Sequence, residues 1–435
     1  MVTTYKTEPL ETYEWAKELR LRHFDEAMKA HEHGKLLIMG NMNAPKEIIA
    51  GIGDFVHLGG EPWGVYITRE GGSKLLMECL EEVERRGYTR DMCAYMRASW
   101  GSMFLDKSPS GGFPRPDLIV AFNQCDSQAK WHQVEAEYLN VPFYVIDTPF
   151  NGGDGTMKVD EPSLQFMVRQ LEDLIEWLQQ TFKRPYNEDR MMEAITHAYR
   201  SRCLWGEICD LQGTIPAPLD YKLILPFVLA LERHAYEEET EKLLTALRDE
   251  LKHRVAKGIT PLPDERCRVT HEGLAPWYAL YLFTYLREHR VAVVGGSQQY
   301  QQTGPVRPTH EDGTLAPENP PNWNGVPKNK EEALRFRATC FMYSQRWSLD
   351  PRIRLKMLKA AITAWKANGV IIMYDRGCQM LSSGQLEVKN AIQREGIPTL
   401  RYETNRIDPR EWSWSHVADS MDSFLEALGV PKIEK

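Results

Sequence analysis

Two cysteines follow apolar runs that predict buried strands, at the points where those runs end. Cys125 comes shortly after "DLIVAF" at 117–122, and Cys378 comes shortly after the run at 370–375. In open parallel sheets, ligands bind beyond the carboxyl ends of the strands, where the N-termini of the following helices favour a thiolate. Cys93, in the polar and aromatic stretch "DMCAYMRASWG", would complete a site of three thiols.

A second interpretation of these thiols is purely structural. The sequence contains eight cysteines but no CxxC pair, so it lacks a compact zinc knuckle and a ferredoxin-type run of cluster ligands. Free cysteines are among the most buried residue types and usually act as small hydrophobic side chains. A metal site must therefore be assembled from distant segments, and inert buried thiols remain the alternative.

Three polar side chains near the ends of the expected strands are candidates for handling a substrate. Glu61 directly follows "FVHLGG" at 55–60, and we expect it to face the same crevice as the thiols, as a proton donor and substrate-binding residue. Asn43 follows the first expected strand and is a further candidate for substrate binding. His132, in the helix expected after Cys125, is interpreted as a surface or packing residue.

The elements that position these residues alternate between strand and helix at both ends of the chain. Strands with continuous hydrophobicity separated by helices predict parallel sheets covered on both faces. We therefore predict an α/β fold with two open parallel-sheet domains of the Rossmann or flavodoxin type and a helical region between them. The expected strands are 35–40, 55–60, 117–122 and 142–147, then 267–273, 291–296, 370–375 and 398–403. The predicted domains are 1–159 with Cys93 and Cys125, a helical region at 160–260, and 261–435 with Cys378.

Composition and charge exclude several classes of partner. The net charge of −8 gives no reason to expect nucleic-acid binding. The longest apolar run, 221–231, is too short to span a bilayer and contains Pro226, and the N-terminal residues lack the apolar core of a signal peptide. We expect a cytoplasmic protein without a membrane partner. The stretch 303–329, rich in Pro, Gly and Asn, predicts an ordered surface loop or a partner-contacting loop.

The cysteine-bearing segments resemble a known family. "MCAYMRASWG", "FNQCDSQAKWHQ" and "GVIIMYDRGCQMLSSGQLEVKNAIQREGIPTLRYETN" are similar to the three cysteine blocks of the 2-hydroxyacyl-CoA dehydratase and benzoyl-CoA reductase family. "APKEIIAGIGDFVHLGGEPWG" at 44–64 resembles its proline-led helix and second strand. The length and the Trp- and Tyr-rich first block are most similar to the B subunits of its ATP-dependent reductase branch. The resemblance implies one [4Fe-4S] cluster, bound by Cys93, Cys125 and Cys378 in the crevice between the two α/β domains.

The resemblance also implies a reaction and a set of partners. An ATP-hydrolysing iron-sulfur activator, supplied by ferredoxin, would pass single electrons to this chain and to a paralogous second catalytic subunit. The ring of benzoyl-CoA, or of a similar aromatic CoA thioester, would then be reduced to a cyclic diene by alternating electron and proton transfer. The sequence contains no GxxxxGK[ST] motif, so ATP would be hydrolysed on partner subunits and not on this chain.

Two other functions keep the same fold. In the first, the chain belongs to a radical 2-hydroxyacyl-CoA dehydratase, although the acidic E-x-D of those enzymes is replaced here by Glu403, Thr404 and Asn405. In the second, the chain only binds or relays electrons and a partner subunit holds the substrate.

Overall fold

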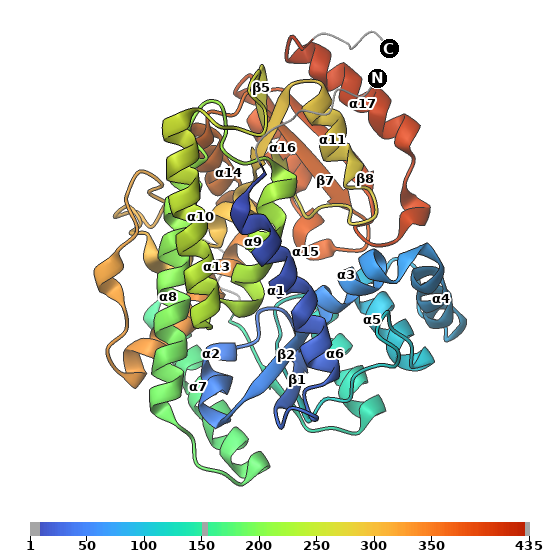
Figure 1. The fold of residues 1–435 in the computed structure, drawn as a ribbon, viewed down its shortest axis with the longest axis vertical. Coiled ribbons are helices and arrows are strands. Elements are labelled where there is room, and N and C mark those ends of the chain that lie inside the picture. The colour runs from blue at the N-terminus through green and yellow to red at the C-terminus, as the bar shows by residue number, and fades with distance from the viewer. Residues whose placement is uncertain (1–8, 150–154, 431–435) are drawn as a thin grey trace.

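The eight strands form two separate parallel sheets of four strands each (Figure 1). The structure is a computed structural model that describes residues 9–149 and 155–430. The first sheet contains β1 (Leu36–Gly40), β2 (Phe55–Gly59), β3 (Leu118–Phe122) and β4 (Phe143–Ile146), and the second contains β5 (Cys267–Glu272), β6 (Val291–Gly295), β7 (Gly369–Asp375) and β8 (Thr399–Thr404). The prediction of two parallel α/β sheets is confirmed.

Both sheets have the same strand order. The first runs β2-β1-β3-β4 and the second runs β6-β5-β7-β8, with every neighbouring pair parallel. This is the order of a flavodoxin-like sheet, in which the direction of winding reverses between the first and third strands. A crevice for ligands is expected at the carboxyl ends of β1 and β3 in one sheet and of β5 and β7 in the other.

Helices cover both faces of the two sheets, as continuous burial along the strands requires; every residue of β3 and β6 is buried. The first part of the chain contains α1 (Glu11–Met28), α2 (Lys46–Ile49), α3 (Gly60–Glu70), α4 (Gly72–Arg85), α5 (Ala94–Leu105) and α6 (Asp126–Leu139). The last part contains α11 (Tyr281–Glu288), α12 (Ser297–Gln301), α13 (Lys330–Leu349), α14 (Pro351–Trp365), α15 (Gln379–Ser382), α16 (Gln385–Arg394) and α17 (Trp414–Ala427).

The middle of the chain is helical, as expected. It contains α7 (Glu161–Phe182), α8 (Glu188–Leu211), α9 (Tyr221–His234) and α10 (Glu238–Lys257), which run beside both sheets (Figure 1). The N-terminal half of α8 packs with α7 against β1 and β3, whereas its C-terminal half packs with α9 and α10 against β6. One long helix thus contacts both sheets and fixes how their edges meet.

Helix α1 joins this helical layer although it precedes the first sheet in the sequence. It packs against α9 and α10, and the carboxylate of Glu250 on α10 accepts the backbone N–H groups of Glu11 and Thr12 at 2.8 and 3.1 Å. These are donors that a helix N-terminus leaves without an intrahelical partner. The domain boundaries drawn from the sequence stay a prediction.

The long segment 303–329 is attached to α8 by buried Arg307, and also by the Tyr199 hydroxyl, which donates to the Asn322 carbonyl, and by the Trp323 indole, which donates to Glu207. It contains only short 3-10 turns, Gly304–Val306 and Trp323–Gly325, in its described structure. Arg307 donates to the carbonyl of Gly206 at 2.7 Å and to Asp210 at 2.6 Å on α8, and to the carbonyl of Pro317 at 2.9 Å. Among the described residues, no helix is both long enough and apolar enough to cross a membrane.

Candidate functional site

The carboxyl edges of the two sheets face each other across a cavity of about 100 Å³. Its walls come from the segments that follow β1, β2 and β3 in the first sheet and β5, β6, β7 and β8 in the second, with Leu229 and Glu232 of α9 and Ser344 to Ser348 of α13 added. This is the crevice that the strand order predicts for each sheet, shared between them.

The three cysteines of the predicted site each precede a helix directly. Cys93 is the N-cap of α5, Cys125 of α6 and Cys378 of α15. Cys125 and Cys378 occupy equivalent positions, because each follows the third strand of its own sheet, next to the point where the winding reverses. The common plan of the two sheets therefore extends to the placement of these thiols.

None of the three sulfur atoms closes a full capping hydrogen bond, yet each faces the first turn of its helix. In each case the backbone N–H three residues further on, at Met96, Gln128 or Leu381, lowers the pKa of the thiol. Backbone N–H groups at a helix start favour a negative charge. Each sulfur is thus placed where a bound thiolate would be stabilised.

The three thiols also lie close enough for their charges to interact. Burial and then the charge of Cys378 raise the pKa of Cys93 to about 12. Burial, followed by the charges of Cys378 and Cys93, raises the pKa of Cys125 well above its usual value. The structure therefore brings together three residues that are far apart in the sequence.

The loop that carries Cys378 lies directly against the loop that carries Cys93. A Cβ atom at Gly377 would come within 3.2 Å of the carbonyl oxygen of Met92 and within 3.0 Å of the Asn405 amide nitrogen. Any larger side chain at position 377 would force these loops apart. Glycine is thus required by the close approach of two segments from different sheets.

A buried ion pair shapes the same loops. Arg406 donates through Nε to Asp375, the last residue of β7, and Asp375 in turn accepts the backbone N–H of Gly377 at 3.1 Å. The positive charge of Arg406 lowers the pKa of Cys378, which burial raises. Arg406 also lines the cavity, and its Nη2 atom is buried without a hydrogen-bond partner. The Nη2 atom has almost no accessible surface and so does not open to the cavity, and the arginine side chain acts on the neighbouring Cys378 thiol.

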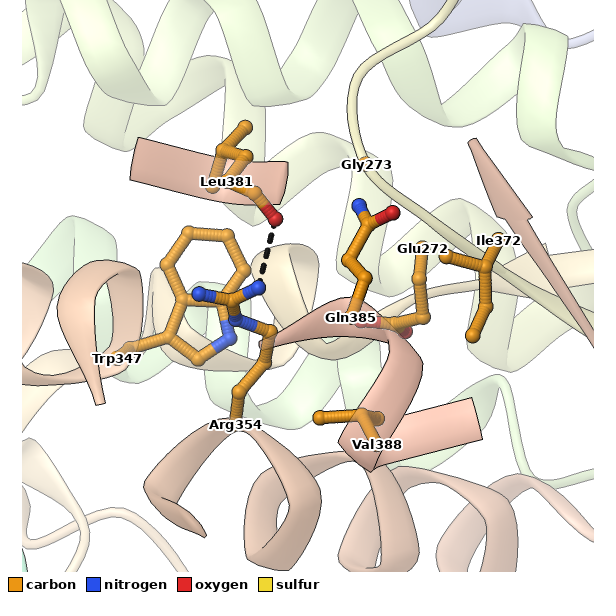
Figure 2. Close-up of a pocket in the computed structure, with 8 residues that line it drawn as sticks. All are labelled: Glu272, Gly273, Trp347, Arg354, Ile372, Leu381, Gln385 and Val388. Carbon is orange, nitrogen blue, oxygen red and sulfur yellow. Dashed lines mark hydrogen bonds between the residues drawn. The ribbon is translucent and has the colours of Figure 1, made fainter. Parts of the chain in front are cut away.

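Helix α15, which follows Cys378, is fixed from behind by Arg354 of α14 (Figure 2). Arg354 donates to the carbonyls of Leu381 at 2.6 Å, Ser383 at 3.1 Å and Ser348 at 2.7 Å. A four-residue helix has too few internal bonds to hold its own position. The guanidinium therefore supplies the rigidity that the short helix lacks.

Asn43 and Glu61 both line the cavity, whereas Cys93, Cys125 and Cys378 are not among its lining residues. Glu61 accepts the backbone N–H of Met42 at 2.9 Å and the side-chain amide of Gln128 at 2.5 Å, and Asn43 donates to Gln124 at 2.9 Å. Their roles toward a substrate stay predictions. His132 is fully buried against Glu135, 3.0 Å from Nδ1, and is a packing residue outside the cavity lining.

One carboxyl-bearing residue of the cavity is absent from the candidates drawn from the sequence. Glu232 lies on α9 among apolar residues, and its side chain reaches the cavity next to Leu229. Burial, reinforced by the charge of Glu61, raises the pKa of Glu232 to about 7, although Arg233 and Lys46 oppose the shift. A charged residue inside the apolar "LILPFVLALE" segment was the only signal that could have identified it.

The remaining five cysteines behave as small hydrophobic residues. Cys79, Cys203, Cys209, Cys267 and Cys340 are buried, whereas Cys93, Cys125 and Cys378 keep partial exposure. The three candidate thiols thus differ from the other five in exposure, and their role as ligands stays a prediction.

The three candidate residues are thiols, the ligand type that an iron-sulfur cluster uses. Among the described residues, no three His, Cys, Asp or Glu side chains converge on one point as a single metal ion requires. A cubane offers a separate iron atom at each corner, so its cysteine ligands do not have to meet at one point, and thiolates are the usual ligands of such clusters. Three neighbouring thiols at helix starts, beside a buried arginine, match this requirement.

The paired sheets and their shared cavity define an α/β protein with a ligand site between two flavodoxin-like units. A model of the family "2-hydroxyglutaryl-CoA dehydratase, D-component" matches residues 41–428, and the chain belongs to this family. Its relatives include the alpha subunit of (R)-phenyllactyl-CoA dehydratase from Clostridium sporogenes, 24% identical with 96% of each chain covered. The B subunit of benzoyl-CoA reductase from Thauera aromatica is 26% identical, with 80% of this chain and 79% of the relative covered.

Proposed function

We propose that this chain is the iron-sulfur subunit of an ATP-dependent aromatic acyl-CoA reductase. The observation that carries the proposal is the meeting of Cys93, Cys125 and Cys378 at three helix starts beside the cavity between the sheets. When bound by these thiols, a [4Fe-4S] cluster would supply single electrons at low potential. Three cysteine ligands would leave one iron of such a cluster without a thiolate.

The lining of the cavity suits a flat apolar acyl group. Its walls include the rings of Tyr95, Trp277 and Trp347 and the aliphatic side chains of Val65, Leu229 and Leu274. The Trp277 indole donates to the Tyr95 hydroxyl at 2.6 Å, which fixes both rings. Aromatic walls with a few polar groups are typical of pockets for small organic ligands.

Polar residues of the same cavity would orient the thioester. Amide side chains from both sheets face it, namely Asn43, Gln124, Gln128, Gln298, Gln301 and Gln302. Amides donate and accept without adding charge, so they bind a carbonyl oxygen without competing for a proton. Arg406 is the one described arginine in the cavity lining, and its positive charge would favour negative charge on a bound acyl group.

The proposal includes partner chains. The relatives named above are subunits, and the sequence lacks an ATP-binding P-loop, so ATP hydrolysis belongs to an activator. We propose a heteromeric complex with a paralogous second catalytic subunit and an iron-sulfur activator that receives electrons from ferredoxin.

Radical dehydration of a 2-hydroxyacyl-CoA is the second candidate. It is favoured by the 96% coverage of the phenyllactyl-CoA dehydratase subunit and by the lactoyl-CoA dehydratase alpha subunit from Anaerotignum propionicum, 24% identical over 82% of this chain and 83% of the relative. Asn405 replaces the acidic residue of the dehydratases, and its Oδ1 accepts the N–H groups of Ile407 and Asp408. An aspartate would make the same bonds, so this position alone does not separate the two reactions.

Iron and sulfide analysis after anaerobic purification tests the cluster. We expect iron and sulfide in the wild-type chain, and a marked loss in each of the variants Cys93→Ser, Cys125→Ser and Cys378→Ser. Cys203→Ser and Cys340→Ser are matched controls, because these thiols are buried elsewhere, and they should keep the wild-type iron content. A colourless, iron-free wild-type protein would overturn the proposal.

Turnover of the assembled complex separates the reactions. Benzoyl-CoA and a 2-hydroxyacyl-CoA are each supplied with the activator and ATP, and the products are identified by mass. A diene product supports the reductase, and an enoyl product replaces it with the dehydratase. If a structure with an aromatic acyl-CoA places the substrate only in the partner subunit, this chain is an electron relay.

A further inference from the structure

Two carboxyl groups line the same cavity in different surroundings. Both oxygens of Glu61 accept hydrogen bonds, Oε2 from the Met42 N–H and Oε1 from Gln128. Glu232 accepts only one, from Gln302 to Oε1 at 2.5 Å, and among the described residues its Oε2 atom has no hydrogen-bond partner. The second carboxyl group therefore keeps one oxygen available to the cavity.

The cationic side chains near Glu232 interact with other groups and not with its carboxyl group. Lys46 donates to the backbone carbonyls of Met42 at 2.6 Å and of Glu232 itself at 2.8 Å, not to the carboxyl group. The Arg233 guanidinium lies over the Phe24 ring, 5.1 Å from its centroid, and Arg202 donates to the carbonyl of Gln302. None of the ion pairs formed by the described residues includes Glu232.

The balance of charge around Glu232 favours its neutral form. Burial is the largest effect on the pKa and raises it, and the charge of Glu61 on α3 raises it further. Arg233 on the same helix, Lys46 on α2 and Arg202 on α8 lower the pKa of Glu232, and the net value is about 7. Tyr221, on the first turn of α9, also lies close enough to interact with the charge of Glu232. A carboxyl group with a pKa near 7 is half protonated at neutral pH, where an acid catalyst is most effective.

We propose that Glu232 is the acid that delivers a proton to the acyl group bound in this cavity. The proposal rests on the proposed reductase function. The O–H bond of Glu232 breaks as a C–H bond forms on a ring carbon that has gained one electron from the low-potential iron-sulfur donor. The resulting carboxylate then takes a proton from water. Two carboxyl groups in contrasting environments are a common way to divide acid and base roles.

Substitution in the assembled complex tests the role in turnover. Glu232→Gln preserves the size of the side chain and its bond with Gln302 but removes the proton. We expect ring reduction to slow by roughly 10²-fold or more and its decline above about pH 7 to disappear. Glu238→Gln, an exposed residue at the start of α10, is the control and should leave both the rate and the pH profile unchanged. A Glu232→Gln rate within twofold of wild type, with the same pH profile, would overturn the proposal.

A second measurement does not require turnover. Infrared difference spectra between pH 5 and pH 9 report the carbonyl stretch of protonated carboxyl groups in the purified chain. We expect a band that titrates with a midpoint near pH 7, that is absent from Glu232→Gln and that persists in Glu61→Gln. Iron content should equal that of wild type in all three variants.

The two measurements separate failure of this inference from failure of the reductase assignment. If wild type reduces benzoyl-CoA but the band near pH 7 persists in Glu232→Gln, the reductase stands and Glu232 is not its acid. If wild type forms no diene, the proton is not delivered to a ring and the proposal fails with the reductase, even when the band is assigned to Glu232.

Discussion

Arg406 and Asp375 form a buried ion pair beside Cys378, with Nε of the arginine donating to the carboxylate at the end of β7. Both residues are almost completely buried, at 5% and 2% exposure. Neither charge is screened by water, so each depends on the other. The pair joins the loops after β7 and β8 on the side where the thiols lie.

Removal of one partner should destabilise the protein strongly. We expect Arg406→Gln to lower the free energy of unfolding by about 3–5 kcal/mol, because it leaves the Asp375 carboxylate buried and unpaired. Arg376→Gln is the matched control in the same loop, since Arg376 pairs with Glu403 and Glu411 at the surface and should cost less than about 1 kcal/mol. Denaturant unfolding measures both. Equal losses of stability in the two variants would contradict this account. Adding Asp375→Asn to the Arg406→Gln variant should recover part of the lost stability, and a double variant with no recovery would also contradict the account.

A second buried arginine connects α5 to the loop after β8. Arg97 is fully buried and donates to Glu84 and to Asp408, each at 3.2 Å. We expect Arg97→Met to cost about 3 kcal/mol or more and to increase hydrogen exchange at residues 405–411, because Asp408 loses its buried partner. Arg85→Met, on the exposed side of α4, should leave exchange at these residues unchanged. Unaltered exchange in the Arg97 variant would contradict this account and would mean that other contacts hold the loop.

The iron-free chain should show unusually unreactive thiols. Burial and the charge of Cys378 raise the pKa of Cys93 to about 12 from an ordinary value of 9.0, so at pH 8 its alkylation by iodoacetamide should be roughly 10³-fold slower than that of a free thiol. Cys378→Ala removes the charge of Cys378, the smaller of the two causes, and should modestly accelerate the alkylation of Cys93. Alkylation is followed by mass spectrometry of the peptide, and rapid labelling of Cys93 in the folded wild type would contradict the prediction.

The same shift predicts how stability depends on pH. The folded chain binds the Cys93 proton more tightly than the unfolded chain, so this contribution is complete below about pH 9 and is lost as the pH rises toward about 12. Denaturant midpoints of iron-free protein across this range, compared with those of Cys93→Ala, isolate the contribution of this thiol. A smaller fall of stability in the variant is expected, and an identical fall would contradict it.

Arg307 should control access of proteases to the long loop. Arg307→Ala removes the bonds to Gly206, Asp210 and Pro317, so we expect new cleavage sites between 308 and 322 in limited proteolysis. Arg335→Ala, which removes an exposed pair with Glu161, is the control and should leave the cleavage pattern intact. An unchanged pattern in the Arg307 variant would mean that other contacts hold the loop.

The strands could be predicted from the sequence because parallel strands buried on both faces leave continuous apolar runs. All eight expected strands are present, and the strand ends placed Cys125 and Cys378 correctly. In contrast, helices α3 and α5 were not predicted from the sequence. Every residue of α5 from Ala94 to Met103 is buried, so the helix has no polar face and no amphipathic period.

A crevice was expected, but the full set of residues that line the cavity could not be predicted, because it depends on how the two sheets meet. Glu232 is more than 100 residues from either sheet's thiols, and only the packing of α9 between the sheets brings it opposite Glu61. The free Nη2 of Arg406 is likewise a property of tertiary geometry and not of the sequence pattern. Side chains that line an interface between units carry no periodic signal of their own.

The order of the two sheets along the chain determines when the three thiols are first present together during synthesis. Synthesis at about 5–20 residues per second means that Cys378 leaves the ribosome on the order of 12 to 50 seconds after Cys125, since roughly 250 residues separate them. During that delay Cys93 and Cys125 have no third thiol beside them. Insertion of the proposed cluster would therefore wait until Cys378 has been synthesised, and the first two thiols would have to stay reduced until then.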